Sequence, residues 1–245
     1  MGTWHSWLAR RVYIAKVGGS NPSVPTMNII YQDKNLLVID KPAGMSADKE
    51  LMSELVKEFP ELKKAGKPPR YGLIHRLDKD TSGILLIAKD DGALSFFQKQ
   101  FKQRAVKKKY IALVYGIMPE KEGEIKTLIS RDGIKQKALL LQGPKKADSR
   151  VAETFWRVIK RYKGYTLLEL SPKTGRKHQI RVHLAYLGFP VTGDKLYSFK
   201  NQKPPKNLQR QFLHANELKI KLLDGNDKIF RSDLPKELKQ IIKTI

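Results

Sequence analysis

The residue of this chain best suited to do chemistry is an aspartate on a short polar segment. Asp78 lies within residues 75–83 (HRLDKDTSG), two residues after Arg76, and the apolar run of residues 84–88 follows. A carboxylate on a loop that enters a buried strand can act as a nucleophile when a cation keeps it ionised and a cleft admits the substrate. An isolated loop aspartate more often caps a turn, so Asp78 alone does not define a site.

A second polar stretch, residues 173–183, gathers cations that could pair with this carboxylate or bind phosphates. We predict a short amphipathic helix over residues 176–187, which makes Arg181 a candidate partner of Asp78. Cations in the first turn of a helix oppose its dipole at a cost of about a few tenths of a kcal/mol each, which a phosphate-binding role would justify. A solvated basic turn is the alternative. The pattern does not separate three cations: Lys173, Arg176 and Lys177.

Tyr110 is the third candidate, because it follows three lysines at the start of an apolar strand pattern. A tyrosine at such a position is ordinarily half-buried packing. Beside a basic run it could equally stack on a nucleic acid base. The residues alone leave both roles open.

Composition favours a nucleic acid partner and argues against a thiolate metal site. The chain has 245 residues, with 48 Lys and Arg against 24 Asp and Glu, a formal net charge of +24 and no cysteine. So large a positive charge attracts phosphates, and no apolar run is long enough to span a membrane. His178 and His183 are five residues apart, not on one helical face, so we predict structural histidines and no metal.

These residues must be positioned by a mixture of strands and helices. The hydrophobic pattern predicts an α+β domain over residues 27–245, built around a largely antiparallel sheet. Residues 1–26 contain no acidic residue and a turn-rich string, so we expect a disordered or non-native extension, with Met27 as an alternative start. The expected strands lie near residues 35–42, 84–88, 110–116, 153–161, 165–171 and 212–222, and the expected helices near 48–58, 92–101 and 176–187.

Residues 75–83 and the strand behind them resemble the signature of the RluA-type RNA pseudouridine synthases. Further segments match that family in the same order, and the resemblance runs from about Met27 to the C-terminus. They are residues 40–44 (DKPAG), 108–116 (KKYIALVYG), 174–183 (TGRKHQIRVH), 193–197 (GDKLY) and 213–215 (LHA). Several motifs in family order make a chance similarity improbable.

The resemblance implies the pseudouridine synthase fold, a mixed and largely antiparallel sheet with flanking helices and a central RNA-binding cleft. It implies an isomerase that converts specific uridines of large-subunit ribosomal RNA or transfer RNA to pseudouridine without cofactor or metal. We expect a cytoplasmic monomer with no membrane association. A catalytically silent RNA-binding or ribosome-assembly protein of the same fold is the alternative. A hydrolase with paired carboxylates is disfavoured, since no second acid lies in a matching motif.

The resemblance also implies a role for each site residue. Asp78 would be the nucleophile that attacks the flipped-out uridine, at the base or at the ribose C1′. Tyr110 would stack on the base and could take part in proton transfer from the sugar. Arg181 would pair with Asp78, Arg76 would fill the gap left by the extruded base, and Leu213 would pack in the pocket.

The chain departs from the family pattern in three places. Many relatives carry an N-terminal S4-like domain, for which residues 1–26 are too few, so we expect RNA selection to rest on the catalytic domain. Residues 45–47 (MSA) stand where relatives often have a valine–histidine pair, and Tyr197 is followed by Ser198 where they have glycine. The last two differences concern details of the substrate loops and leave the expected chemistry unchanged.

Overall fold

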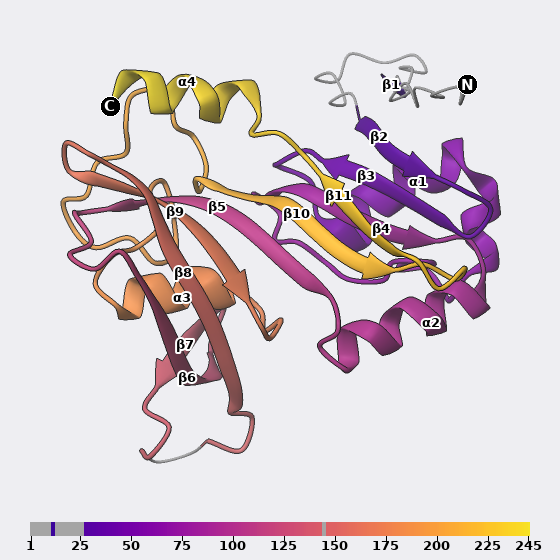
Figure 1. The fold of residues 1–245 in the computed structure, drawn as a ribbon, viewed down its shortest axis with the longest axis horizontal. Coiled ribbons are helices and arrows are strands. Elements are labelled where there is room, and N and C mark those ends of the chain that lie inside the picture. Colours follow the sequence, from indigo (N-terminus) through magenta and orange to yellow (C-terminus); the bar gives the residue numbers. More distant parts are fainter. Residues whose placement is uncertain (1–10, 13–26, 144–145) are drawn as a thin grey trace, which may run out of the picture.

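A long twisted β-sheet organises the protein (Figure 1). The structure, a computed structural model, describes residues 11–12, 27–143 and 146–245. In the described part the strands follow the order β1-β2-β3-β4-β10-β5-β9-β8-β6-β7, with β11 paired to β10. The pairing of β4 with β10 is parallel and the other pairings are antiparallel, which confirms the predicted α+β class. The strands are β1 (Arg11–Val12), β2 (Met27–Gln32), β3 (Leu36–Lys41), β4 (Ser82–Ala88), β5 (Lys107–Tyr115), β6 (Glu122–Asp132), β7 (Lys135–Leu139), β8 (Arg150–Tyr162), β9 (Tyr165–Pro172), β10 (Leu213–Lys221) and β11 (Asp227–Arg231).

Helices cover the two halves of this sheet. In Figure 1, α1 (Met52–Glu58) and α2 (Asp91–Lys102) lie beside β2 to β4, and α3 (Gln179–Tyr186) lies among β6 to β9. The C-terminal α4 (Lys236–Thr244) packs on the central strands, since Leu238 and Ile241 share a core cluster with residues of β5 and β9. A π-helical turn (Ala47–Leu51) precedes α1 and a 3-10 turn (Pro60–Lys64) follows it.

Strands β3 and β4 are buried on both faces, which explains their continuous apolar sequences. Leu37 and Ile39 point into the cluster that contains α1, while Leu36 and Val38 point into the cluster that contains α2. Successive side chains of a strand face opposite sides, so a strand covered on both sides needs apolar residues throughout. The loop that carries Asp78 is attached to β4, whose seven residues are all buried.

The structure corrects several details of the sequence-based expectations. Helix α3 begins at Gln179, three residues later than predicted, so Arg176 belongs to the preceding turn and the helix-dipole cost assigned to it does not apply. Strands β6, β7 and β11 were not predicted, because their exposed faces carry mostly polar residues. The expectation for residues 1–26 falls outside the described residues, apart from the pairing of β1 with β2.

Candidate active site

The three candidate segments of the sequence meet at one cavity. Asp78, Tyr110 and Arg181 all line a hollow of about 200 Å³, together with Leu213 at the start of β10. The cavity forms where the loop before β4, strand β5 and the turn before α3 come together. Its remaining walls include five basic side chains: Arg76, Lys108, Arg176, Lys177 and His178.

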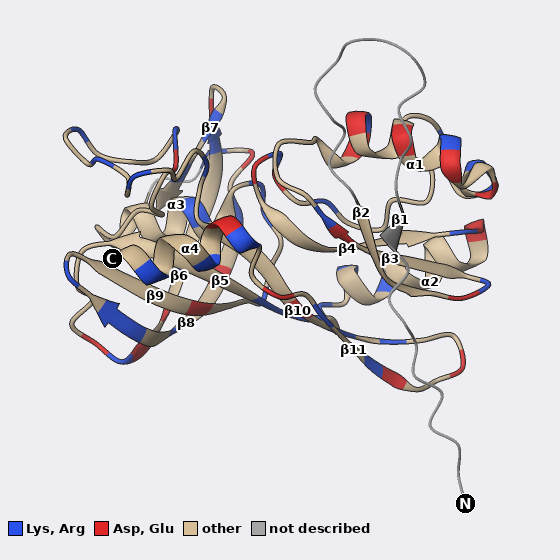
Figure 2. Cartoon of the chain, turned by 90° about the horizontal axis from the view of Figure 1, so that it is seen from above, with Lys and Arg blue, Asp and Glu red and all other residues tan. Residues whose placement is uncertain are grey.

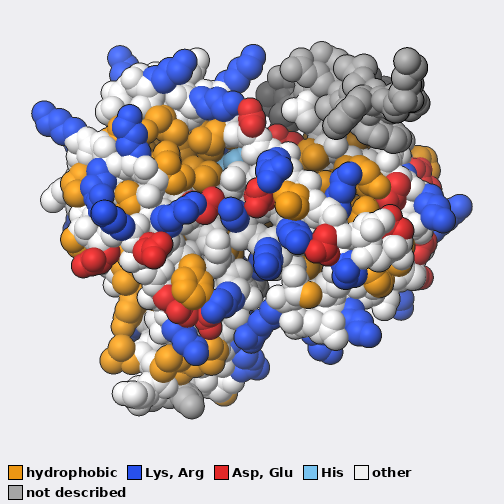
Figure 3. Space-filling view, in the orientation of Figure 1, with side chains coloured by type: hydrophobic (Ala, Val, Ile, Leu, Met, Phe, Trp, Pro, Cys, Tyr) orange, Lys and Arg blue, Asp and Glu red, His pale blue; other side chains and the backbone are white. Residues whose placement is uncertain are grey.

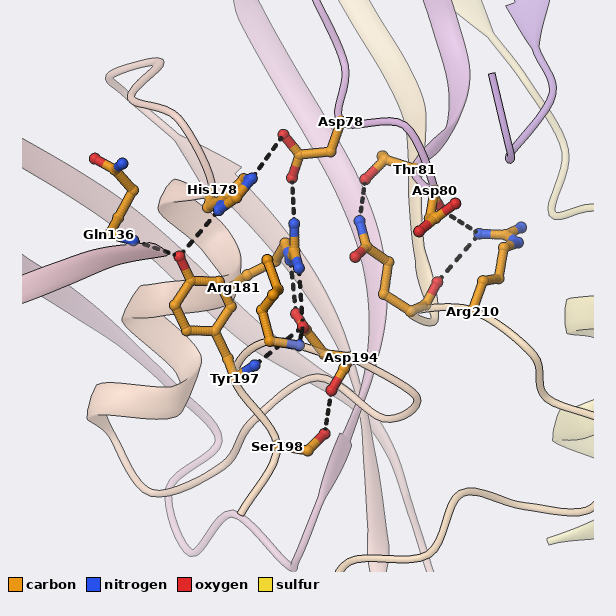
Figure 4. A network of polar contacts seen from close by, with 12 residues as sticks. Asp78, Asp80, Thr81, Gln136, His178, Arg181, Asp194, Tyr197, Ser198 and Arg210 are labelled. Atoms are coloured by element: carbon orange, nitrogen blue, oxygen red, sulfur yellow. Dashed lines mark hydrogen bonds and ion pairs between the residues drawn. The ribbon is translucent and has the colours of Figure 1, made fainter. Parts of the chain in front are cut away.

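Arg181 forms an ion pair with Asp78, as the resemblance implies. Its Nη1 donates to Asp78 Oδ2 at 3.0 Å, while Nε and Nη2 donate to Asp194 Oδ2 and Oδ1 at 2.6 and 2.9 Å (Figure 4). Burial lowers the pKa of Arg181, but the hydrogen bonds and charges of Asp194 and Asp78 outweigh burial and raise it overall. A charged arginine that donates to one oxygen of Asp78 orients this carboxylate in the cavity wall.

The loop that carries Asp78 is braced by a buried lysine. Lys41, at the end of β3, has no exposed surface, and its ammonium donates to the carbonyls of Pro42, Met45 and Lys79 at 2.7 to 3.0 Å. Three acceptors satisfy all three N–H groups of a lysine. Because one of them belongs to the residue after Asp78, Lys41 ties the loop that carries Asp78 to the neighbouring loop of residues 42–45.

The glycine of the Thr-Ser-Gly turn allows a close contact that places this loop. Gly83 has φ +117, and a Cβ there would lie 2.2 Å from the carbonyl oxygen of Ala215 on β10. Nearby, Thr81 accepts from Gln211 Nε2 at 2.7 Å, and Arg210 donates to the Asp80 carbonyl at 3.2 Å (Figure 4). Only glycine tolerates both the backbone angle and the contact, so the motif is explained by the parallel pairing of β4 with β10.

Strand β5 supplies an aromatic and a cationic wall. Lys108 and Tyr110 are two residues apart, so both side chains lie on the face that lines the cavity. Burial lowers the pKa of Lys108 to about 8, and its ammonium lies 3.4 Å from the carbonyl oxygen of Thr174. Burial, with the charge of Asp78 as the lesser cause, raises the pKa of Tyr110, so its hydroxyl stays protonated at neutral pH.

The basic residues named from the sequence lie around this cavity at different depths. Arg176 and Lys177 line it directly. Arg76 lines it too, although its Nη1 bonds to Asp48 Oδ2 at 3.0 Å and its side chain is 54% exposed. Lys173 lies farther out, in an adjoining groove, where it pairs with Glu153. The sequence could not separate the roles of Lys173, Arg176 and Lys177, because the turn before α3 directs these neighbouring cations to different places.

Positive charge surrounds the site on a larger scale. Among the described residues that line the cavity, Asp78 is the single carboxylate, against five lysine and arginine side chains. The adjoining groove is lined by seven cations: Arg70, Arg76, Lys102, Arg104, Lys108, Lys173 and Arg176. Lysine and arginine occur on both halves of the sheet (Figure 2) and predominate over acids in the middle of the face in Figure 3. Such a surface attracts a polyanion.

Three residues of the site were not predicted from the sequence: Asp194 and Tyr197 lie behind the cavity wall, and His178 lines it. Asp194 holds Arg181, and Tyr197 stacks under the same guanidinium with its ring centre 5.2 Å from Cζ. His178 lies between Tyr197 and Asp78. Asp194 and Tyr197 belong to residues 193–197, which match a motif of the family, and this match was the signal that the sequence offered. No pattern within these residues indicated a contact with Arg181.

The other histidines described by the structure have ordinary packing roles. His75 is half-buried and stacks on Phe101 at 4.7 Å, His183 bonds to threonine hydroxyls, and His214 bonds to Ser82. Within the described ranges there is no group of three or more side chains suited to hold a metal ion. No helix among those residues has the length and apolar character needed to cross a membrane.

Comparison with known proteins identifies the family. The profile of the RNA pseudouridylate synthase family matches residues 35–186, well over half of the chain. The protein belongs to this family. The match includes Asp78, Tyr110 and Arg181 and ends at the last residue of α3.

Individual relatives agree with this assignment. The chain is 34% identical to ribosomal large subunit pseudouridine synthase D of Nitrosomonas europaea, over 89% of this chain and 65% of that protein. It is 36% identical to the protein of the same name from Borreliella burgdorferi, over 88% and 67%. It spans 59 to 65% of the length of three of its curated relatives. The solved structure of human RNA pseudouridylate synthase domain containing 1 has a TM-score of 0.73 at 29% identity, covering 89% of this chain and 87% of that one.

Proposed function

We propose that this protein isomerises uridine in RNA to pseudouridine, with Asp78 as the nucleophile. The observation that carries the proposal is the placement of Asp78 in a cation-lined cavity, with Arg181 bonded to one carboxylate oxygen and Tyr110 in the same wall. Family membership supports the reaction class. A silent RNA-binding protein would have no need for a buried arginine held at a cavity carboxylate.

The reaction breaks the bond from uracil N1 to ribose C1′ and joins C5 to C1′. The proton on C5 is lost, N1 gains a proton, and no oxidant or reductant is required. Asp78 attacks either the base or C1′, and the covalent adduct holds one part of the nucleoside while the uracil turns. Arg181 holds and orients the carboxylate before attack.

The base must leave its stack to reach this cavity. Flipping costs about a few kcal/mol, which contacts between phosphates and the surrounding cations offset. Tyr110 and Leu213 offer the flipped uracil an aromatic and an aliphatic surface. Arg76, exposed at the mouth of the cavity, is placed to occupy the gap that the base leaves.

We propose large-subunit ribosomal RNA as the substrate class, because relatives from several bacteria carry the name ribosomal large subunit pseudouridine synthase. Transfer RNA is the second candidate.

The test is to map pseudouridines across total RNA from cells with the gene, without it, and with Asp78→Ala in its place. One ribosomal site that disappears in both altered strains is the expected result. A transfer-RNA site would correct the substrate class, and a site retained with Asp78→Ala would reject the nucleophile.

A further inference from the structure

A histidine lies against the oxygen of Asp78 that Arg181 leaves free. His178 Nε2 is 3.9 Å from Asp78 Oδ1, and His178 Nδ1 is 2.9 Å from the hydroxyl of Tyr197 (Figure 4). The imidazole is 10% exposed and forms part of the cavity wall. It therefore connects the nucleophile to a tyrosine that itself does not line the cavity.

The backbone of His178 is held in an unusual conformation. Its φ of 56 and ψ of 17 place it in the left-handed region, immediately before α3 begins. A residue other than glycine is uncommon there, and such strain persists only where the surrounding contacts over-determine it. The contacts of the imidazole with Asp78 on one side and Tyr197 on the other constrain His178 in this way.

The hydrogen bonds of Tyr197 determine which ring nitrogen of His178 carries the proton. The Tyr197 oxygen accepts from the backbone N–H of Gln136 on β7 at 2.7 Å. Its own proton is then free to be donated to His178 Nδ1, which must be unprotonated to accept it. A neutral ring consequently carries its proton on Nε2. With the proton on Nδ1 instead, the Tyr197 hydroxyl would lose this acceptor, and the lone pair of Nε2 would point toward the Asp78 carboxylate.

The charges around the ring oppose one another. Burial is the largest influence and lowers the pKa of His178; Asp78 and Asp194 raise it, and Arg181 and Lys177 lower it. The net shift is downward, so the imidazole is neutral at neutral pH. This result agrees with the tautomer required by Tyr197, because only a neutral ring can accept at Nδ1.

We propose that His178 is a positioning residue for Asp78, acting as a neutral imidazole whose Nε2–H faces Oδ1 while Arg181 holds Oδ2. This inference rests on the proposed function. At 3.9 Å the N–H forms no hydrogen bond with Oδ1. It turns the positive end of its dipole toward this oxygen and leaves the lone pairs needed for attack free. An imidazolium would instead pair with the carboxylate charge and weaken the nucleophile.

The arrangement can be tested without any RNA, by ¹⁵N NMR of the full-length protein labelled in its histidine rings. The signals of His178 are assigned by their loss in His178→Asn, since asparagine tolerates the left-handed backbone. We expect the Nε2–H tautomer at pH 7, and a change in its Nδ1 shift in Tyr197→Phe. The Nδ1–H tautomer or an imidazolium at pH 7 would overturn the proposal, whatever the protein's substrate.

The role in catalysis is tested by single-turnover kinetics on an RNA that carries the mapped uridine. In His178→Asn, whose side chain is too short to reach Oδ1, and in Tyr197→Phe, we expect the rate constant to fall by about 10- to 100-fold. The dissociation constant for RNA should change by less than about twofold, because neither change removes a cation. Tyr186→Phe, at an exposed tyrosine at the end of α3, is the matched control and should be unchanged.

The pH profile separates positioning from a purely structural effect. Tyr197→Phe removes the donor to Nδ1, so protonation of His178 becomes easier and the acid limb of the rate profile should move up by about half a pH unit or more. Unchanged rates and profiles in both variants would overturn the role of His178. An inactive wild-type protein on every RNA would reject the proposed function instead, and the NMR result would stand by itself.

Discussion

Asp194 holds Arg181 through two hydrogen bonds, at 2.6 Å to Nε and 2.9 Å to Nη2, and its carboxylate has no exposed surface. This bidentate contact fixes the plane of the guanidinium and leaves Nη1 directed at Asp78. Asp194 also accepts from the backbone N–H groups of Leu196 and Tyr197. The orientation of Asp78 is thus set by an acid behind the cavity wall.

Removing the charge of Asp194 should damage both stability and chemistry. In Asp194→Asn, Arg181 is left buried with a weaker partner, so we expect the free energy of unfolding to fall by about 3 kcal/mol. Urea denaturation measures this change. Asp233→Asn, which alters an exposed pair with Lys239, is the control and should leave the unfolding midpoint unchanged. Equal midpoints for the two variants would contradict the structural role of Asp194.

Asp78→Asn should abolish isomerisation and preserve RNA binding. The amide keeps the size of the side chain but cannot form the covalent adduct, while loss of a negative charge among cations leaves phosphate binding equal or tighter. Single-turnover assays and filter binding measure the two properties. Turnover above background would contradict the nucleophile assignment. Asp224→Asn, in the turn between β10 and β11, should behave as wild type in both assays.

RNA affinity should fall steeply as salt is added. Each phosphate contact releases counterions, so the logarithm of the binding constant falls linearly with the logarithm of salt concentration. We expect Arg176→Ala and Lys177→Ala each to reduce the slope by about one. Lys243→Ala, in the last turn of α4, provides the control with the same change of charge. A slope that neither cavity variant alters would place the phosphates elsewhere.

Lys108 should make RNA binding depend on pH. Burial lowers the pKa of Lys108 to about 8, so its positive charge is lost as the pH rises through that value. The free protein then has one cation fewer in the cavity, and RNA affinity should fall between pH 7 and pH 9. Lys108→Arg keeps the charge over this range and should remove that part of the decline. Binding titrations at constant ionic strength measure it, and identical pH profiles for the two proteins would exclude Lys108.

The same shift has a consequence for folding stability. In the unfolded chain Lys108 has its ordinary pKa of 10.5, above the folded value. The folded protein therefore binds fewer protons between pH 8 and 10.5, and this residue's contribution to stability improves as the pH rises through that window. Below pH 8 both states are protonated, and the cost of burying the charge is present in full.

The sequence by itself was sufficient for the family, the sheet class and the candidate residues Asp78, Tyr110 and Arg181, which the fold brings to one cavity. Local motifs carry this information: residues 75–83 combine an acid with the glycine that β4 needs, and β3 and β4 have the apolar runs of strands buried on both faces. Strands β6 and β7 were not predicted, because this half-exposed pair of strands carries polar side chains between short apolar runs. Patterns that lie within one element can be interpreted without knowing its neighbours.

Contacts between distant segments were decided only by the tertiary structure. Arg181 is 103 residues from Asp78, and no periodicity relates them; the fold brings them within 3.0 Å. The contacts of Asp194 and His178 exist only in the tertiary structure, where three segments pack together: the turn before α3, the loop after α3 and β7. The sequence identifies which groups can react. Packing sets the distances between these groups. Distance and burial then determine which carboxylate is oriented for reaction and which nitrogen of a histidine ring carries the proton.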